Sequence, residues 1–147
     1  MPTNDTGPTN DPGSLIRELQ EALGASNVLH EPEDLVVYEY DATIERSLPD
    51  VVVFPATAED VAAAVRLAVK YDLPVVPRGS GTGLSGGAVP IKGGILIVMT
   101  RMNRILEIDA DNRVAVVQPG VINLHLQNAL AEYGLLYAPD PSSQRVC

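Results

Sequence analysis

The sequence predicts an α+β fold built on a βαβ unit, with a small mixed sheet and flanking helices. The first observation is a run of β-branched and aromatic residues at 51–54, closed by Pro55, which is typical of a strand buried on both faces. A helical pattern at residues 57–71 follows, and the apolar pair Val75-Val76 begins a second strand. Strand, helix and strand in so short a span predict parallel strands joined by a right-handed crossover.

Before this unit, the sequence predicts a polar, flexible tail at residues 1–13 and a helical and connecting segment at residues 14–50. Ser14 is the expected N-cap of a short amphipathic helix, which Gly24 ends. Apolar residues recur between them at helical spacing: Leu15, Ile16, Leu19 and Leu23. Residues 30–50 are acidic and rich in turn-forming residues, so we expect a connection with one helical turn.

The helix of the βαβ unit carries its own start signal. Thr57 and Asp60, three residues apart, match a capping box, in which each side chain bonds the backbone N–H of the other. An apolar stripe is expected to face the sheet, formed by Val61, Val65, Ala68 and Val69.

Three further elements are predicted toward the carboxyl end. Residues 95–99 are the strongest strand signal in the chain, and residues 104–109 and 113–118 are typical of an antiparallel hairpin. A helix ended by Gly134 follows, with an apolar face made of Ile122, Leu126, Ala129, Leu130 and Tyr133. Two prolines and two serines in residues 135–147 disfavour regular structure there.

Charge and cysteine content exclude several classes of function. The net charge is −9, and the excess acidity lies in the first 50 residues, which disfavours binding to nucleic acid or anionic lipid. The only cysteine, Cys147, permits neither an intrachain disulfide nor a thiolate metal site. The sequence shows no secretory signal and no membrane span, so we expect a cytoplasmic protein, peripheral to the inner membrane only through partners.

The glycine-rich stretch at residues 77–87 is the main candidate site. Residues 81–86 match G-x-G-x-x-G after a strand, which is the pattern of a dinucleotide-binding turn. That turn needs a helix starting inside the glycines, but residues 88–94 are short and broken by Pro90. A Walker loop is excluded as well, because no Lys-Ser or Lys-Thr pair follows Gly86.

The dinucleotide-binding turn and the Walker loop share one physical basis, which also applies to residues 77–87. Successive residues free to adopt positive φ can turn their N–H groups into one concavity that holds a phosphate without a helix. Arg78 stands at the end of the strand, where a bidentate phosphate contact is expected, and Ser80, Thr82 and Ser85 offer hydroxyls. The alternative is a surface loop in which Arg78 meets a carboxylate.

Other candidates are weaker. Asp140, within a Pro/Asp/Ser segment, fits a generic turn. His30 and His125 lack a second ligand at metal-binding spacing, and Glu59 and Asp60 fit the first turn of a helix. We therefore predict no catalytic residue and no metal ligand within this sequence.

Taken together, the strand, the Arg-Gly-x-Gly-Thr-Gly loop and the later Pro-Asp-Pro-Ser segment resemble the amino-terminal part of FAD-linked oxidases of the vanillyl-alcohol-oxidase type. The resemblance is to the branch that contains glycolate oxidase and D-lactate dehydrogenase, and makes residues 51–147 the first part of an FAD-binding domain. It implies that one set of residues wraps the FAD pyrophosphate: Arg78, Gly79, Ser80, Gly81, Thr82, Gly83, Leu84, Ser85, Gly86 and Gly87. It implies a second FAD contact at Pro139, Asp140, Ser142 and Ser143.

The resemblance also implies a function. Some relatives attach flavin covalently through a histidine in this loop, but the matching residue here is Thr82, so non-covalent FAD is expected. The second FAD subdomain, the cap and the substrate- and metal-binding histidines are expected beyond residue 147. The whole would oxidise a small 2-hydroxy acid, such as glycolate or D-lactate, to the 2-oxo acid.

Two alternatives and several partners remain open at this point. The enzyme alternative is an FAD-dependent oxidase of the same superfamily acting on another alcohol or a sugar. The other is a non-catalytic nucleotide-binding or interaction module. The expected partners are the substrate, an electron acceptor or partner subunits, and a second copy of the chain at the exposed subdomain face.

Overall fold

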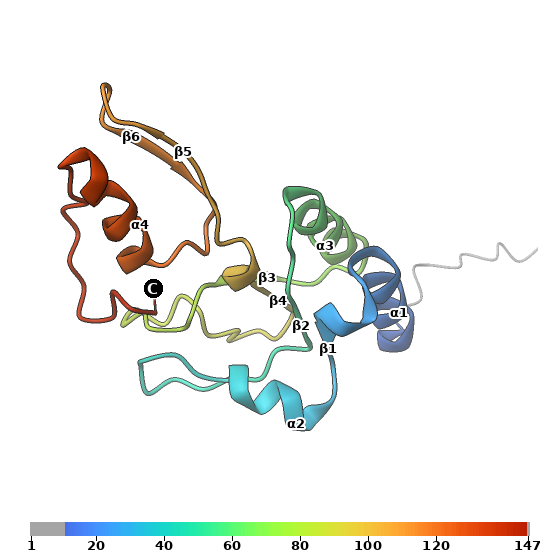
Figure 1. Cartoon of the computed structure of the whole chain (residues 1–147). Coiled ribbons are helices and arrows are strands. Elements are labelled where there is room, and N and C mark those ends of the chain that lie inside the picture. The colour runs from blue at the N-terminus through green and yellow to red at the C-terminus, as the bar shows by residue number, and fades with distance from the viewer. Residues whose placement is uncertain (1–10, 147) are drawn as a thin grey trace, which may run out of the picture.

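The computed structural model describes residues 11–146, and these form a four-stranded sheet and a separate hairpin (Figure 1). In the larger sheet the strand order is β1-β2-β4-β3. Strands β2, β4 and β3 run parallel, whereas β1 pairs antiparallel with β2. The strands span Val28–Leu29 (β1), Val51–Val53 (β2), Val75–Arg78 (β3) and Ile95–Val98 (β4). A small mixed sheet with flanking helices confirms the predicted α+β class.

The predicted βαβ unit is present, with one strand inserted. Helix α3 (Ala58–Lys70) connects β2 to β3, but β4 lies between them, so that Ile95 pairs with both Val51 and Val75. The capping box is confirmed, because the Thr57 hydroxyl accepts the Asp60 N–H at 3.1 Å and the Asp60 carboxylate accepts the Thr57 N–H at 3.1 Å. All four residues of the central strand β4 are buried, as expected of a strand covered on both faces.

Helix α1 (Pro12–Leu23) begins earlier than the sequence predicts. Asp11, not Ser14, is the N-cap: its carboxylate accepts the N–H groups of Gly13 and Ser14. Pro12 follows in the first turn, where its fixed φ suits a helix and its missing N–H costs nothing. The predicted tail of residues 1–13 therefore includes the start of this helix, and its residues 1–10 lie outside the described part of the chain.

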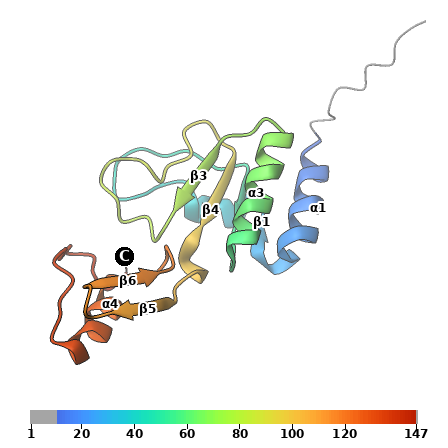
Figure 2. The same ribbon diagram turned by 90° about the horizontal axis from the view of Figure 1, so that it is seen from above.

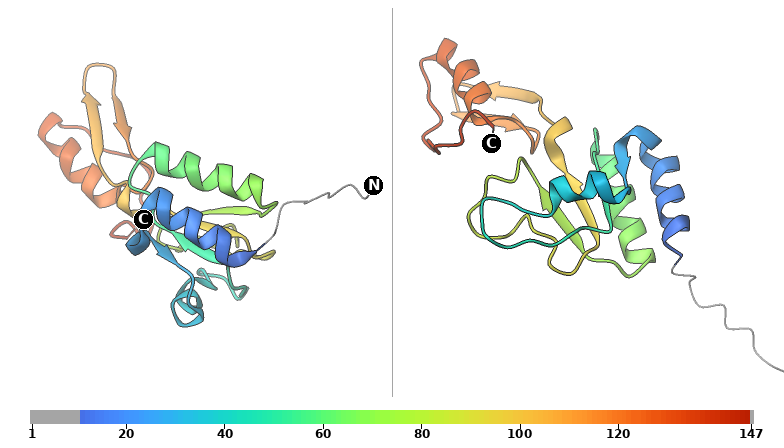
Figure 3. Two further views of the ribbon diagram at one scale, coloured as in Figure 1. Left: turned by 90° about the vertical axis from the view of Figure 1, so that its right-hand side faces the viewer. Right: turned by 90° about the horizontal axis from the view of Figure 1, so that it is seen from below.

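Helices α1 and α3 cover one face of the larger sheet (Figure 3). Leu15, Leu19 and Leu23 of α1 are buried there, as the spacing predicts. The stripe predicted on α3 is partly wrong, because Val65 and Val69 are exposed. The helix buries Ala68, as predicted, together with Ala64, and their small side chains allow α1 to pack closely beside it.

The other face of this sheet is covered by the predicted connecting segment. A single turn, α2 (Pro32–Leu35), runs into the 3-10 turn η2 (Val36–Tyr38). Leu35 packs on Val52 and Leu96, and the Tyr38 ring meets the Phe54 ring edge to face at 5.8 Å. This segment thereby comes to lie beneath the glycine-rich loop, where the site is built.

The hairpin stands apart from the larger sheet (Figure 2). Strands β5 (Ile105–Asp109) and β6 (Val114–Val117) pair antiparallel, with an irregular register near Ile105. Helix α4 (Asn123–Leu130) and the turn η4 (Ala131–Tyr133) follow, and Gly134, in the left-handed region, ends them as predicted. Two more 3-10 turns, η1 (Ala25–Asn27) and η3 (Met99–Arg101), flank the sheet. No helix among residues 11–146 is long and apolar enough to cross a membrane.

Glu18 joins α1 to α3 at the surface. Its carboxylate accepts hydrogen bonds from Lys70 Nζ at 2.6 Å and from the Tyr71 hydroxyl at 2.7 Å. The bond from Lys70, and then that from Tyr71, lowers the pKa of Glu18 below its ordinary 4.5. The same pair raises the pKa of Lys70 above its ordinary 10.5.

We expect Glu18→Gln to lower the melting temperature at pH 7. Because the folded pKa lies below the unfolded value, the stabilisation is complete above pH 4.5 and is lost as the pH falls through the folded pKa. Circular dichroism melting of both proteins across this range checks the sign. A difference in melting temperature that stays constant into strong acid would contradict it.

Candidate functional site

A cavity of about 470 Å³ lies where the glycine-rich loop leaves the carboxyl end of β3. One wall is the loop itself, and the other is the segment that follows β6. The loop faces the hairpin side of the molecule in Figure 2. From the predicted site, the cavity is lined by Gly79, Ser80, Gly81, Thr82, Gly83, Ser85 and Gly87.

The loop presents backbone donors along this wall. Within the described part of the chain, the N–H groups of residues 80–87 donate to no protein acceptor. Gly81 and Gly86 adopt positive φ, 74° and 70°, which most residues avoid. No helix begins within the loop, as the sequence predicts. A run of backbone N–H groups that border a cavity and bond to no acceptor in the protein is typical of an anion-binding nest.

Arg78 lies beneath the loop and is not part of the cavity wall. Only 8% of this residue is exposed, and its Nη1 donates to the Tyr40 carbonyl at 2.7 Å and, less closely, to the Ala88 carbonyl at 3.4 Å. Its Cζ lies 5.8 Å from the centre of the Tyr38 ring, within the range of a cation–π contact. The structure thus gives the guanidinium partners in the protein, and its predicted phosphate contact remains a prediction.

Two of the glycines that line this cavity, Gly81 and Gly120, have no room for a Cβ. A Cβ at Gly81 would collide with the Arg78 guanidinium, so glycine lets the loop pass over that side chain. A Cβ at Gly120 would collide with the Met99 carbonyl oxygen, and the Gly120 N–H donates to the Met102 carbonyl at 2.8 Å. Gly120 is not among the predicted site residues, although its position after a strand and a proline is typical of a tight turn.

The predicted second contact lies mostly elsewhere. Pro139 lines a different cavity, and its carbonyl accepts a hydrogen bond from Asn123 at 3.1 Å. Asp140 and Ser142 are exposed, and the Ser143 carbonyl accepts the Val146 N–H at 2.8 Å. The two predicted segments meet through Val146, whose carbonyl accepts the Ser80 hydroxyl. Val146 and residues 119–122 therefore complete the loop cavity, which sequence reasoning missed.

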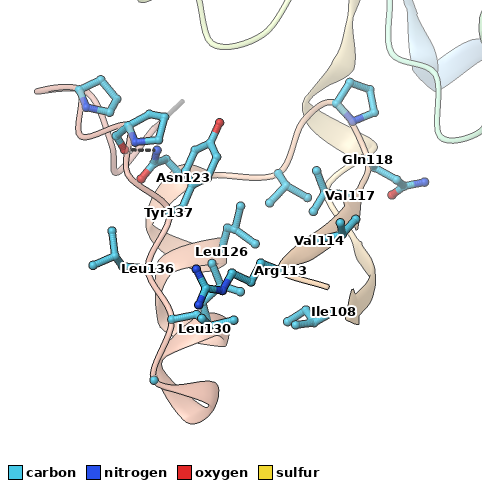
Figure 4. A pocket seen from close by; sticks show the side chains of 17 residues that line it. Ile108, Arg113, Val114, Val117, Gln118, Asn123, Leu126, Leu130, Leu136 and Tyr137 are labelled. Carbon is cyan, nitrogen blue, oxygen red and sulfur yellow. Dashed lines mark hydrogen bonds between the residues drawn. The ribbon is translucent and has the colours of Figure 1, made fainter. Parts of the chain in front are cut away.

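The second cavity, of about 920 Å³, separates the hairpin from α4 (Figure 4). Ile108, Val114 and Val117 lie on the hairpin side, facing Leu126 and Leu130 of the helix. Its wall, as far as the described residues form it, is mainly apolar and offers no group of titratable side chains for chemistry. This space fits the packing of apolar side chains better than it fits catalysis.

The remaining candidates occupy structural positions. Asp60 caps α3, as described above, and Glu59 lies in the same first turn. The His30 Nδ1 lies 3.4 Å from a carboxylate oxygen of the neighbouring Glu31. His125 is exposed on α4. None of these positions indicates a catalytic role for the two histidines or the two acidic residues.

Comparison with known protein families finds that residues 49–147 match the family described as "FAD binding domain". Among curated proteins, the chain is 44% identical over 141 residues to the glycolate oxidase subunit GlcD of Escherichia coli (strain K12), covering 95% of this chain and 28% of that protein. It is 43% identical over 99 residues to D-lactate dehydrogenase of Anaerostipes hadrus, covering 67% of this chain and 21% of that protein.

A solved structure of p-cresol methylhydroxylase with substrate bound is similar in fold. The TM-score is 0.78 at 26% identity, over 90% of this chain and 27% of that one. The chain thus spans less than a third of the length of each of these three proteins.

Proposed function

The chain belongs to the FAD binding domain family, and from this premise we propose that its glycine-rich loop binds the FAD pyrophosphate in an enzyme that oxidises a small 2-hydroxy acid. The observation that carries the proposal is the run of N–H groups at residues 80–87, which lack protein acceptors and border a cavity. Successive backbone N–H groups can form a concavity that binds phosphate oxygens.

The residues of this cavity fit such a group. A Cβ would meet nothing within 4 Å at Gly79, Gly83 or Gly87, so the loop leaves space for a ligand to approach the backbone. The side chains of Thr82 and Ser85 also line the cavity and can donate to phosphate oxygens. Among residues 11–146, the cavity wall carries no carboxylate that would repel an anion.

The identity of residue 82, a threonine, supports non-covalent binding of FAD. A threonine hydroxyl at this position offers no imidazole for covalent attachment of the flavin. Acid precipitation of the purified protein is expected to leave the yellow colour in the supernatant. Colour that stays in the protein pellet after washing in denaturant would contradict this part of the proposal.

The names of the relatives support the proposed substrate class. Glycolate and D-lactate, which their names contain, are both small 2-hydroxy acids. Oxidation to the 2-oxo acid removes a hydride from carbon and a proton from the hydroxyl, and bound FAD supplies the hydride acceptor. We assign no catalytic residue to this chain, whose part is to bind and orient the cofactor.

The likeness to p-cresol methylhydroxylase favours a second candidate, an FAD-dependent oxidase of another alcohol. The identity to that protein is lower than the identity to the glycolate oxidase subunit, so we place it second. Anaerobic bleaching of the flavin by glycolate or D-lactate, but not by an aromatic alcohol such as 4-hydroxybenzyl alcohol, separates the two. The word "subunit" in the relative's name leads us to propose partner subunits as well.

FAD binding is tested by thermal unfolding of the full-length protein. A ligand that binds only the folded state at 100 times its Kd adds about 2.7 kcal/mol of stability, which raises the melting temperature by several degrees. FAD is expected to produce this shift and riboflavin, which lacks the pyrophosphate, a smaller one. Absence of flavin absorbance together with no shift by FAD would overturn the proposal.

A further inference from the structure

We propose that Arg78 and Asp41 are positioning residues that clamp the two ends of the glycine-rich loop and so hold its N–H groups in the shape that binds FAD. This inference rests on the proposed function and gives Arg78 a role other than direct contact with phosphate. Both residues are buried, at 8% and 6% exposure, although charged side chains are seldom buried without a partner.

Arg78 touches both ends of the loop and the segment beneath it. It is itself the last residue of β3, directly before the loop, and its Nη1 reaches the carbonyl of Ala88 just after the loop. The same nitrogen donates to the Tyr40 carbonyl. Gly81 then passes over the guanidinium so closely that a Cβ would collide with it. The side chain therefore supports the loop from below.

Asp41 completes the clamp from the segment beneath the loop. Its Oδ1 accepts the Thr43 N–H at 2.8 Å and the Thr43 hydroxyl at 2.6 Å. These hydrogen bonds from Thr43 are the main cause of the lowered pKa of Asp41, and the charge of Arg78 and the N–H of Ala88 lower the pKa further. Its Oδ2 is buried and has no hydrogen-bond partner within residues 11–146, and Asp41 directly follows Tyr40, whose carbonyl accepts the Arg78 Nη1.

Direct binding of phosphate by Arg78 and support of the loop by Arg78 predict opposite effects on FAD binding when Asp41 is removed. If Arg78 bound phosphate directly, removing a nearby carboxylate would leave anion binding unchanged or strengthen it. If the pair clamps the loop, removing either partner releases the loop and weakens binding. The second substitution then adds little, because the clamp is already broken.

The experiment uses Arg78→Ala, Asp41→Ala and the double variant in the full-length protein. The matched controls are Arg66→Ala and Glu21→Ala, which change exposed residues on α3 and α1. The Kd of FAD is measured by flavin fluorescence at a temperature where circular dichroism shows every variant folded. Each single variant is expected to raise the Kd about tenfold or more, the range for a hydrogen bond to a charged group.

The Kd of FAD for the double variant is expected to lie within about threefold of the Kd of the weaker-binding single variant, because the two residues act as one unit. A Kd for Asp41→Ala equal to or below that of the unmodified protein would overturn the clamp. A double variant whose losses multiply would overturn it too. Variants that only melt earlier, with FAD Kd unchanged, would show a merely structural role and also overturn it.

A second measurement separates this proposal from the proposed function. Without FAD, chymotrypsin cleavage after Leu84, which is 80% exposed, is expected to accelerate in both single variants but not in the controls. Unchanged cleavage overturns the clamp even where FAD binds normally. An unmodified protein that binds no FAD overturns the proposed function, while the cleavage rates still decide whether Arg78 and Asp41 hold the loop.

Discussion

Gly81→Val is expected to reduce FAD binding more than any other single change in the loop. Gly81 has a φ of 74°, a region that costs a residue with a Cβ about 1–2 kcal/mol and a β-branched residue more. Its Cβ would also collide with the buried Arg78 guanidinium, which carbonyl contacts hold in place. Both effects move the loop, so we expect the Kd of FAD to rise about a hundredfold, a loss near 2.7 kcal/mol.

The matched control is Gly13→Val, the same substitution in the first turn of α1. There a Cβ would make only ordinary contacts with Asp11, the nearest at 3.5 Å. Flavin fluorescence titration of both variants compares the two positions. A Kd for Gly81→Val within about threefold of the unmodified protein would show that the loop conformation does not determine binding.

Ile95→Ala should have the largest effect on stability. Ile95 is fully buried in the central strand β4, pairs with Val51 and Val75, and belongs to the cluster under α1 and α3. Removing its side chain leaves a cavity where three elements meet. The expected loss is about 2–5 kcal/mol in the free energy of unfolding, measured by urea denaturation.

Ile44→Ala provides the comparison, since Ile44 is 95% exposed. Its stability should change by less than about 0.5 kcal/mol. Equal losses at the two positions would mean that the larger sheet is not the core of this unit.

Local patterns in the sequence predict most elements of this fold. The β-branched run at residues 51–53, the capping box at Thr57 and the hairpin turn are signals contained within a few residues, and the structure has all three. The resemblance to FAD-linked oxidases is confirmed by the family match. Residue type and spacing suffice where neighbours along the chain decide the outcome.

The sequence predicts the structure less well where contacts between distant segments determine it. Val69 fits a helical stripe, but the position of α1 turns that side of α3 to solvent and buries Ala64. The insertion of β4 between β2 and β3 is likewise a matter of long-range pairing. At the helix start, Asp11 and Ser14 are both good N-caps, and Pro12 decides in favour of Asp11.

The candidate site shows the same difference between features set by neighbouring residues and features set by long-range contacts. The sequence predicts the anion nest from the glycines alone, but it cannot show that Arg78 faces Tyr40, thirty-eight residues earlier in the chain. Nor does it show that Val146 and Gly120 close the cavity, since both come from segments with no binding motif of their own. These contacts depend on the packing of the connecting segment and of the hairpin.

The most direct test is hydrogen–deuterium exchange of the amides of residues 80–87 with and without FAD. These N–H groups have no protein acceptor within residues 11–146, so they should exchange rapidly in the protein without cofactor. We predict strong protection on saturation with FAD and little with riboflavin, which lacks the pyrophosphate. Unchanged exchange of this loop in an FAD-saturated protein would contradict pyrophosphate binding by these N–H groups.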